Sequence, residues 1–354
     1  MPFNPSSDHF DGTIFFNPPS MAPESGASGS DQIPRSDAPV DEPALAGERP
    51  RGRKRGGLVS IIRWRFRKER TIWPPLPPEP KPAGDPRAPV PPGHAAVTFI
   101  GHSSFLVRLP GLTFMTDPVF SDRCSPVSWA GPKRARPPGR RFADLPKLDL
   151  LLMSHNHYDH MDLPSLRAIQ RRDDPMVVTP LGNARHLAKA GMHRVLEGDW
   201  WQELHPRDDV KVTITPARHF SARTLWDRGR SLWGGMMLET AGKRLYFAGD
   251  SGHGRHWEQI GQRLGAPDVA LLPIGAYEPR SIMAPVHVNP AEAVAAHQAL
   301  GARQSIGMHF GTFKLTDEPI DAPEQHLAEA RAEAGVEDGA FVTLGFGETR
   351  CFSL

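Results

Sequence analysis

Residues 148–160 join an apolar strand-like run to a cluster of residue types that bind metals. The run "LDLLLMS" (148–154) is apolar almost throughout, as expected of a strand covered on both faces. It leads directly into "HNHYDH" (155–160), in which three histidines and one aspartate fall within six residues. A single histidine is more often a structural residue than a ligand, whereas four candidate ligands at this spacing indicate a metal. The sequence therefore predicts a metal site in the loop at the end of this strand.

Three other segments present a metal-binding residue type in the same context. His219 follows "VKVTITPAR", Asp250 follows "KRLYFAG", and His309 closes the run "QSIGM". Because open α/β folds gather their sites at the carboxyl ends of strands, we expect these side chains to converge with the 155–160 cluster.

The remaining pattern after residue 95 alternates strand-like runs with helical stretches. Further strands are predicted at "AVTFIG", "SFLVRL", "LTFMTD", "PMVVT", "GGMMLET" and "DVALLP". Helical spacing is found in "DLPSLRAIQRR", "GNARHLAKAG", "RHWEQIGQRL" and "NPAEAVAAHQALG". This mixture predicts an α/β fold in which helices pack on β-sheets.

The number of candidate ligands indicates how many ions the site holds. The candidates are His155, His157, Asp159, His160, His219, Asp250 and His309. They are too many for one tetrahedral zinc that keeps an open position, but they suit two ions about 3.5 to 4 Å apart with a bridging aspartate. Imidazole and carboxylate ligands favour zinc, with manganese or iron as alternatives. Such ions would lower the pKa of a bound water to about 7 and so supply a hydrolytic nucleophile.

These motifs together resemble the metallo-β-lactamase superfamily. The resemblance is closer to one branch, the N-acylphosphatidylethanolamine-hydrolysing phospholipase D family, through "GAYEPR" and "HVNPAEA". Other matching blocks lie in order between residues 96 and 350: "TFIGHSSFLV", "TDPVFSDRCSP", "GPKR", "LLMSHNHYDHMD", "EGDWW", "TPARHFSARTLWD", "YFAGDSG", "MHFGTF" and "GETR". The amino-terminal part is similar more weakly, through "FFNP" (15–18) and "IIRW" (61–64).

The resemblance implies a fold and a ligand set. The fold is an αββα four-layer sandwich formed by residues 95–354, with two Zn²⁺ along one edge. By similarity, one zinc is held by His155, His157 and His219. The other is held by Asp159, His160 and His309, and Asp250 bridges the two.

The resemblance also implies roles in catalysis and substrate binding. Asp159 and His287 are the expected catalytic residues. His287 would contact the phosphate or act as the leaving-group acid, and the alternative is a structural residue at the entry to a helix. Tyr158 would face the substrate or instead pack against the sheet. Asp117 would support the ligands through hydrogen bonds.

The implied reaction is hydrolysis of N-acylphosphatidylethanolamine. A hydroxide held by the two zinc ions would attack phosphorus and release an N-acylethanolamine and phosphatidic acid. The expected partners are the phospholipid substrate and an anionic membrane surface. A homodimer is one alternative for the assembly, and no nucleic-acid partner is expected.

Residues 1–94 differ in composition and predict an arm, partly disordered. Gly, Ser, Pro and Asp dominate residues 17–48, and ten prolines lie within residues 74–92. Between them, residues 49–70 carry ten Lys or Arg against one Glu, interleaved with apolar residues. That mixture suits an interfacial helix on an anionic membrane, and the alternatives are a solvated basic tail or a contact with nucleic acid.

Two cysteines and no recognisable secretory signal favour a reducing compartment, so we expect a cytoplasmic protein that associates peripherally with membranes. Three other functions are weighed against the lipid enzyme. A soluble lactonase or phosphodiesterase of the same fold would act on a non-lipid substrate. A flavodiiron-type oxidoreductase is disfavoured because those proteins carry an acid where this chain has His157. A non-catalytic binding protein could lose ligands freely, yet all seven are present.

Overall fold

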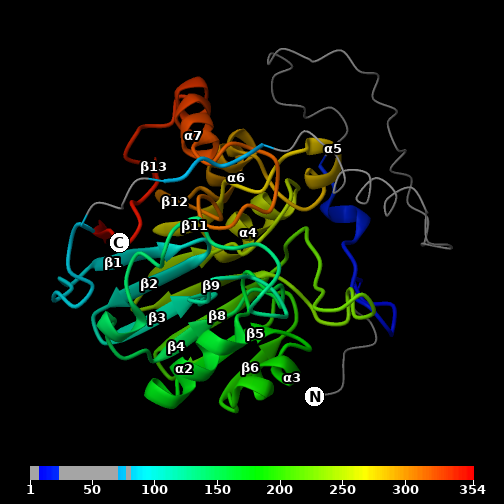
Figure 1. The fold of residues 1–354 in the computed structure, drawn as a ribbon. Coiled ribbons are helices and arrows are strands. Elements are labelled where there is room, and N and C mark those ends of the chain that lie inside the picture. The colour runs from blue at the N-terminus through cyan, green and yellow to red at the C-terminus, as the bar shows by residue number, and fades with distance from the viewer. Residues whose placement is uncertain (1–7, 24–70, 77–80) are drawn as a thin grey trace.

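The computed structural model describes residues 8–23, 71–76 and 81–354 (Figure 1). Within these ranges the chain forms two seven-stranded sheets, and helices cover the outer face of each sheet. The predicted αββα sandwich is therefore confirmed. The basic segment 49–70 lies outside the described residues, so the prediction of an interfacial helix there stays a prediction.

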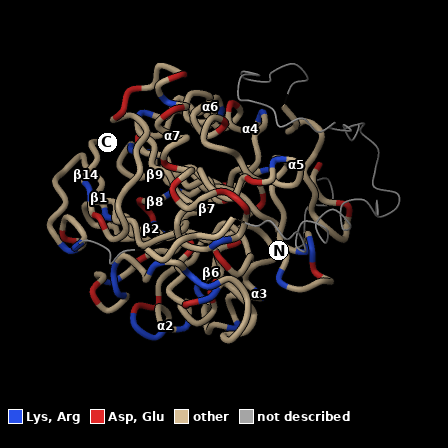
Figure 2. The backbone as a smooth tube through the Cα atoms, turned by 45° about the horizontal axis from the view of Figure 1, so that its top comes forward, with Lys and Arg blue, Asp and Glu red and all other residues tan. Residues whose placement is uncertain are grey.

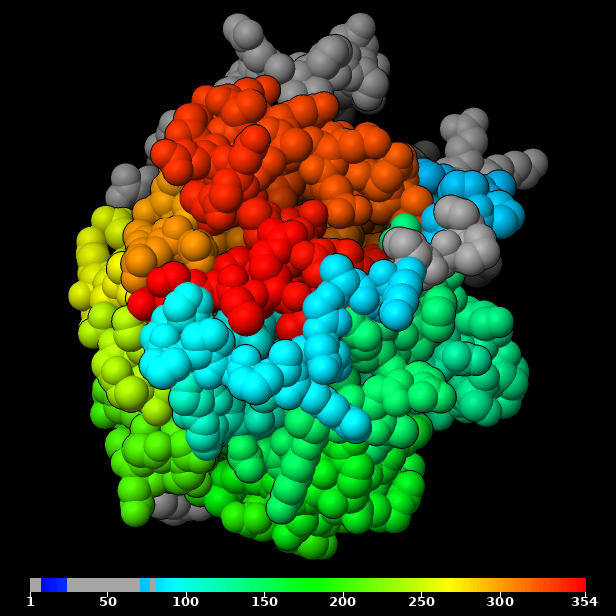
Figure 3. Space-filling model, turned by 90° about the vertical axis from the view of Figure 1, so that its left-hand side faces the viewer, coloured from blue at the N-terminus to red at the C-terminus, as the bar shows by residue number. Residues whose placement is uncertain are grey.

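The first sheet has the order β14-β1-β2-β3-β4-β5-β6. Its strands are β1 (His94–Gly101), β2 (Ser104–Leu109), β3 (Leu112–Thr116), β4 (Leu150–Leu152), β5 (Met176–Pro180), β6 (Val195–Gly198) and β14 (Thr349–Ser353). The strands β1, β2 and β3 are antiparallel, whereas β3 to β6 are parallel. At the edge, β14 pairs with β1, and the backbone N–H of Thr349 donates to Ala83 O. Figure 3 shows the carboxyl-terminal residues lying against the segment that precedes β1.

The second sheet has the order β13-β12-β11-β10-β9-β8-β7. Its strands are β7 (Glu203–Arg207), β8 (Val210–Thr215), β9 (Gly235–Thr240), β10 (Lys243–Phe247), β11 (Val269–Pro273), β12 (Gln304–Met308) and β13 (Phe341–Val342). Strands β7 to β10 are antiparallel, and β10 to β13 are parallel. As a result β8, β10 and β12 run in the same direction, and their carboxyl ends reach one edge of the sheet.

Helices form the two outer layers. The helices α2 (Leu163–Asp173) and α3 (Ala184–Leu187) pack on the first sheet, with Leu166 and Ile169 of α2 in one buried cluster with strand residues such as Leu151. The helices α4 (His256–Leu264), α6 (Pro290–Leu300) and α7 (Ala322–Glu333) cover the second sheet. Short helices are η1 (Pro19–Met21), η2 (Phe142–Asp144), η3 (Ala188–Ala190) and α5 (Arg280–Met283).

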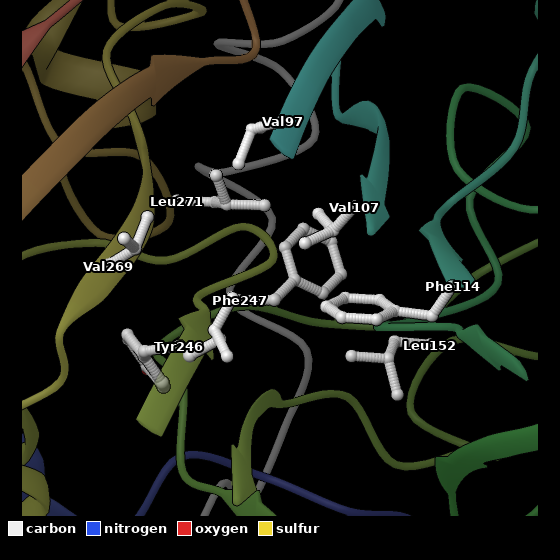
Figure 4. Close-up of a pocket in the computed structure, with 9 residues that line it drawn as sticks. Val97, Val107, Phe114, Leu152, Tyr246, Phe247, Val269 and Leu271 are labelled. Carbon is white, nitrogen blue, oxygen red and sulfur yellow. The ribbon is translucent and has the colours of Figure 1, made fainter. Parts of the chain in front are cut away.

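The main hydrophobic core lies between the sheets. Figure 4 shows Val107, Phe114 and Leu152 of the first sheet pointing toward Phe247 and Leu271 of the second. The space left among these side chains is about 10 Å³, which is too small for a substrate. This interior is therefore packed core, and the site must lie at an edge of the sandwich.

The sequence pattern did not predict several elements. The strands β6, β7, β13 and β14 and the helix α7 were not predicted. In β7 the burial only alternates between exposed and half-buried residues, so the strand carries no run of apolar side chains. The predicted helix 182–191 is instead a single turn, α3, continued by η3 and ended by Gly191 at φ 84°. The left-handed backbone there suits a glycine.

Residues 8–23 fall within the predicted arm, yet they pack against the sandwich. Phe15 and Met21 are buried in the main core, at 4% and 3% exposure. The His9 ring stacks on Trp200 with centroids 4.0 Å apart, and its Nε2 lies 2.7 Å from Asp199 Oδ1. We call residues 8–23 the N-terminal strap (blue in Figure 1). Composition did not predict the strap. A few buried aromatic and sulfur side chains anchor it, and they hardly change the average composition of the segment.

The start of α6 offers a test of local stability. Asn289 Oδ1 accepts the N–H of Glu292 at 2.8 Å, and Glu292 Oε2 accepts the N–H of Asn289 at 3.0 Å, which makes a capping box. Asn289→Ala should lower the free energy of unfolding by about 1 kcal/mol, measured by urea denaturation. The control Gln298→Ala, on an exposed position of the same helix, should change it by less than about 0.5 kcal/mol. Equal effects in both variants would contradict the capping role.

Candidate metal centre

The structure brings the seven predicted ligands together at one edge of the sandwich. His155, His157, Asp159 and His160 lie in the loop between β4 and α2. His219 follows β8, Asp250 follows β10, and His309 follows β12. The first sheet thus supplies four side chains and the second sheet three, so the cluster forms only where the edges of the two sheets meet.

Three of the histidines form a first group. The Nδ1 atom of His157 lies 2.9 Å from His155 Nε2 and 3.2 Å from His219 Nε2. Nitrogen ligands at about 2.0–2.1 Å from a tetrahedral zinc lie roughly 3.3 Å apart, so the spacing suits an ion. The outer nitrogens have other partners, since His155 Nδ1 lies 2.9 Å from Ser154 Oγ and His219 Nδ1 lies 3.0 Å from Val286 O. These contacts fix which nitrogen points inward.

A second group contains Asp159, His160 and His309. The Nε2 atoms of His160 and His309 each lie 3.5 Å from Asp159 Oδ2. On its far side, the His160 ring places Nδ1 2.7 Å from Asp117 Oδ2. Asp117 also accepts hydrogen bonds from the N–H and hydroxyl of Ser154. The expectation that Asp117 holds ligands in place rather than binding metal agrees with this geometry.

Asp250 lies between the two groups. Its Oδ2 is 3.1 Å from Nε2 of both His160 and His309, 3.6 Å from His219 Nε2 and 3.9 Å from His155 Nε2. The side chain of Asp250 is only 2% exposed. One oxygen of Asp250 therefore faces both sets of imidazoles, which is the position of a bridging ligand.

The charges at the centre are arranged around the two carboxylates. Burial opposes ionisation of Asp250, but His160 and His309 outweigh it and hold the pKa of Asp250 well below its usual range. For His309, burial is likewise outweighed, by Asp250 and Asp159, and the pKa rises to about 9. Burial holds the pKa of His155 well below its usual range, so that ring is neutral, as a metal ligand must be.

Polar atoms without hydrogen-bond partners test whether a cation fits. Among the described residues, His309 Nδ1 and Asp250 Oδ1 are buried with no such partner, and the Nε2 atoms of His160 and His309 contact only the carboxylates of Asp159 and Asp250. Buried polar groups are normally satisfied, and such atoms, which other described residues also carry, here meet at the predicted ligands. Imidazoles and carboxylates without thiolate are a donor set that zinc accepts. The residues present therefore fit a metal cofactor.

Sequence reasoning missed His102. Its Nε2 lies 3.0 Å from Asp159 Oδ2, and its ring centroid is 4.0 Å from that of His309. It groups with Asp159, His160 and His309 as a further residue able to reach an ion. His102 directly follows β1, so extending the strand-end argument to "AVTFIG" would have found it.

Three residues of the centre have left-handed backbones. They are His102 at φ 58°, Asp117 at φ 29° and His309 at φ 66°. This region costs a non-glycine residue on the order of 1–3 kcal/mol and is concentrated at functional sites. Nothing in the sequence pattern indicates such strain.

His287 and Tyr158 border the centre. The Nδ1 atom of His287 lies 4.0 Å from Asp250 Oδ2, and its ring centroid is 5.1 Å from that of His219. Tyr158 donates a hydrogen bond from its hydroxyl to Arg223 O at 3.0 Å and lines a surface groove. The tyrosine also contacts a small apolar cluster that includes Val119, and its role toward the substrate stays a prediction.

The N-terminal strap contacts two segments that carry predicted metal ligands. Asn17 Nδ2 donates to His219 O at 3.0 Å, and Met21 O accepts the N–H of Arg255 in the chain that follows Asp250. The strap therefore holds two ligand-bearing segments in place. The motif "FFNP" in the strap was one of the weaker matches to the phospholipase D family, but its contact with His219 was not predicted.

Comparison with known proteins identifies related chains. Residues 113–310 match the model of the family described as the β-lactamase superfamily domain. An N-acyl-phosphatidylethanolamine-hydrolyzing phospholipase D from Caenorhabditis elegans is 39% identical over 263 residues, covering 71% of this chain and 74% of that protein. A mitochondrial phospholipase D of the same description from Saccharomyces cerevisiae is 35% identical. The aligned region covers 72% of this chain but only 55% of the yeast protein.

Solved structures agree in fold. The metallo hydrolase Igni18 from Ignicoccus hospitalis superposes with a TM-score of 0.55 at 24% identity, covering 74% of this chain and 99% of that chain. At this identity the likeness concerns the fold alone.

Asp250 offers the sharpest test of the centre. Asp250→Ala should remove most of the bound metal, because the bridging carboxylate is lost. The chain should stay folded. Metal content would be measured by elemental analysis and folding by thermal unfolding. Asp149→Ala is the matched control, since this exposed carboxylate lies at the opposite end of β4. Full metal content in Asp250→Ala would contradict the bridging role.

Proposed function

The chain belongs to the β-lactamase superfamily and within it to the N-acylphosphatidylethanolamine-hydrolysing phospholipase D family, and from this premise we propose that it hydrolyses the phosphodiester of N-acylphosphatidylethanolamine. As a member of this family it is a metal-dependent hydrolase. The products would be an N-acylethanolamine and phosphatidic acid. The observation that supports this proposal most is the 39% identity to the nematode phospholipase D, which extends over 71% of the chain.

We further propose two Zn²⁺ as the cofactor. His155, His157 and His219 would hold one ion, Asp159, His160 and His309 the other, and Asp250 both. Bound ions would lower the pKa of a water and offset the charge that develops on the phosphoryl oxygens. Catalytic metal sites keep an open position for water and substrate, and Asp159, with a side chain 14% exposed, marks the open side of this centre.

The residues around the ions prepare the centre for an anionic substrate. Asp117, Ser154 and the carbonyl of Val286 orient ligand rings through their outer nitrogens. His102 donates to Asp159 and fixes the carboxylate nearest the open side. Because these groups are preorganised, little reorganisation is needed when the phosphodiester arrives.

His287 is suited to contact the phosphoryl group. The start of α6 is capped by Asn289 and Glu292, so the helix entry does not depend on the imidazole. Burial, partly opposed by Asp250, lowers the pKa of His287 to about 3, so the ring is neutral near pH 7. A neutral imidazole donates a hydrogen bond but has no extra proton for a leaving group, which favours the phosphate contact over the acid role.

We also propose that the protein associates with membranes, as a lipid substrate would require. Among the described residues, no helix is long and apolar enough to cross a bilayer. We propose peripheral attachment to an anionic surface, to which the ten basic residues of segment 49–70 would contribute. The homodimer stays a prediction.

A direct assay tests the substrate. Full-length, metal-loaded protein is incubated with phosphatidylcholine vesicles that contain N-acylphosphatidylethanolamine, and the products are identified by mass spectrometry. We expect N-acylethanolamine and phosphatidic acid in equal amounts, and none from Asp250→Ala. Release of neither product, together with cleavage of a soluble phosphodiester or a lactone, would favour the non-lipid alternative.

The role of His287 can be tested separately. His287→Ala should keep its metal and lower kcat by about 10²- to 10³-fold, the typical effect of removing one hydrogen-bond donor to a transition state. His287→Gln should recover part of the rate, since its amide can still donate. An unchanged rate in His287→Ala would return the residue to a structural role.

A further inference from the structure

Large apolar side chains gather at the tips of two surface loops. Of the five large hydrophobic residues that are exposed in the described part of the chain, four lie here: Val127 at 37%, Trp129 at 79%, Leu225 at 86% and Trp226 at 79%. We call these four residues the tryptophan rim. Large aromatic side chains are seldom left in water without a role, and a cluster of them marks an interaction surface.

The two loops border one groove beside the metal centre. The groove has a volume of about 710 Å³ and is lined by Ser125–Ser128 of one loop and by Arg223, Thr224 and Asp227 of the other. Tyr158, which lies between the ligands His157 and Asp159, forms part of the same lining. Val127 of the rim lines this groove, the other three rim residues lie on the two loops that border it, and Tyr158 connects the groove to the metal-binding motif.

Contacts beneath the rim hold the second loop to that motif. The Arg223 guanidinium donates to the carbonyls of Asn156 and Met161 and lies 4.0 Å from the centre of the Tyr158 ring. Asp227 Oδ1 accepts the N–H groups of Arg223 and Thr224 at 2.9 and 2.8 Å. These bonds fix the base of the loop, so Leu225 and Trp226 project outward from an ordered support.

Basic side chains surround the rim. Arg167 of α2 and Lys189 of η3 are exposed and line the groove. Arg185, Arg228 and Arg230 are exposed nearby, and Figure 2 shows Lys and Arg recurring on α2 and the chain around it. Of the three acidic residues in the lining, Asp162 and Asp227 are occupied by internal hydrogen bonds.

We propose that the tryptophan rim docks on an anionic phospholipid surface. Exposed Trp and Leu side chains enter the interfacial region of a bilayer. The basic side chains that surround the rim complement anionic headgroups. Docking in this orientation turns the groove and Tyr158 toward the membrane, so a headgroup can approach the metal centre while its acyl chains stay near the bilayer. The lipid as substrate rests on the proposed function, whereas docking itself does not require turnover.

Vesicle binding tests the proposal without any reaction. Full-length, metal-loaded protein is sedimented with phosphatidylcholine vesicles, with or without phosphatidylglycerol, that lack N-acylphosphatidylethanolamine. Replacing Trp129, Leu225 and Trp226 together with Ser should lower the partition coefficient at least about tenfold, equivalent to about 1.4 kcal/mol. The triple variant should keep its metal content and thermal unfolding midpoint, which shows that the fold is intact.

Charge reversal provides a second, matched test. Arg167→Glu with Lys189→Glu should weaken binding only to vesicles that contain phosphatidylglycerol and should reduce its dependence on salt. The control pair is Lys147→Glu with Arg194→Glu, whose side chains line a groove at the opposite end of β4. This pair should bind as the parent does.

The outcomes separate docking from turnover. An unchanged partition of the triple variant overturns the proposal, as does an equal loss in the control pair. Loss of binding on deletion of residues 24–70, with the triple variant unaffected, would also overturn it. Asp250→Ala should still bind vesicles. A parent protein that binds through the rim but releases no N-acylethanolamine would contradict the proposed substrate and leave the docking surface standing.

Discussion

The buried carboxylate of Asp250 is the constraint on which the centre depends. An ionised carboxylate taken out of water costs several kcal/mol unless positive charge compensates it. Four imidazole nitrogens, from segments that follow β4, β8 and β12, lie 3.1 to 3.9 Å from one of its oxygens, and the two nearest, those of His160 and His309, carry the compensating charge. Because β4 belongs to one sheet and the other two strands to its partner, both sheets must be in place before the charge is compensated. The centre can therefore assemble only where the two sheets are packed together.

The seven ligands could be predicted because their placement follows from strand direction. A run such as "LDLLLMS" fixes where a strand ends, and the side chain after it emerges at the edge where parallel strands finish. The same logic applied to β1 would have included His102. The left-handed backbones of His102, Asp117 and His309 could not be predicted, since they result from surroundings that the chain assembles only in three dimensions.

Elements that carry little apolar periodicity were the ones missed. The strand β14 contains exposed Arg350 and Cys351, and it exists because it pairs with the edge strand β1. The N-terminal strap lies in a region whose Gly, Pro and Ser content predicts no packing, yet Phe15 and Met21 fill sites in the core. Composition averages over many residues, whereas a strap needs only a few well-placed side chains.

The strap also determines how the chain can change in length. Asn17 contacts the His219 segment, while Trp73 donates to Glu318 O and borders a small cavity with His309. The described residues on either side of segment 24–70 are therefore both anchored near metal ligands. Because loop-closure entropy grows slowly with loop length, by about 0.6 kcal/mol for each doubling, residues could be gained or lost between these two anchors at small cost to the hydrolase. The basic sequence between the two anchors could thus change during evolution while the metal centre stays the same.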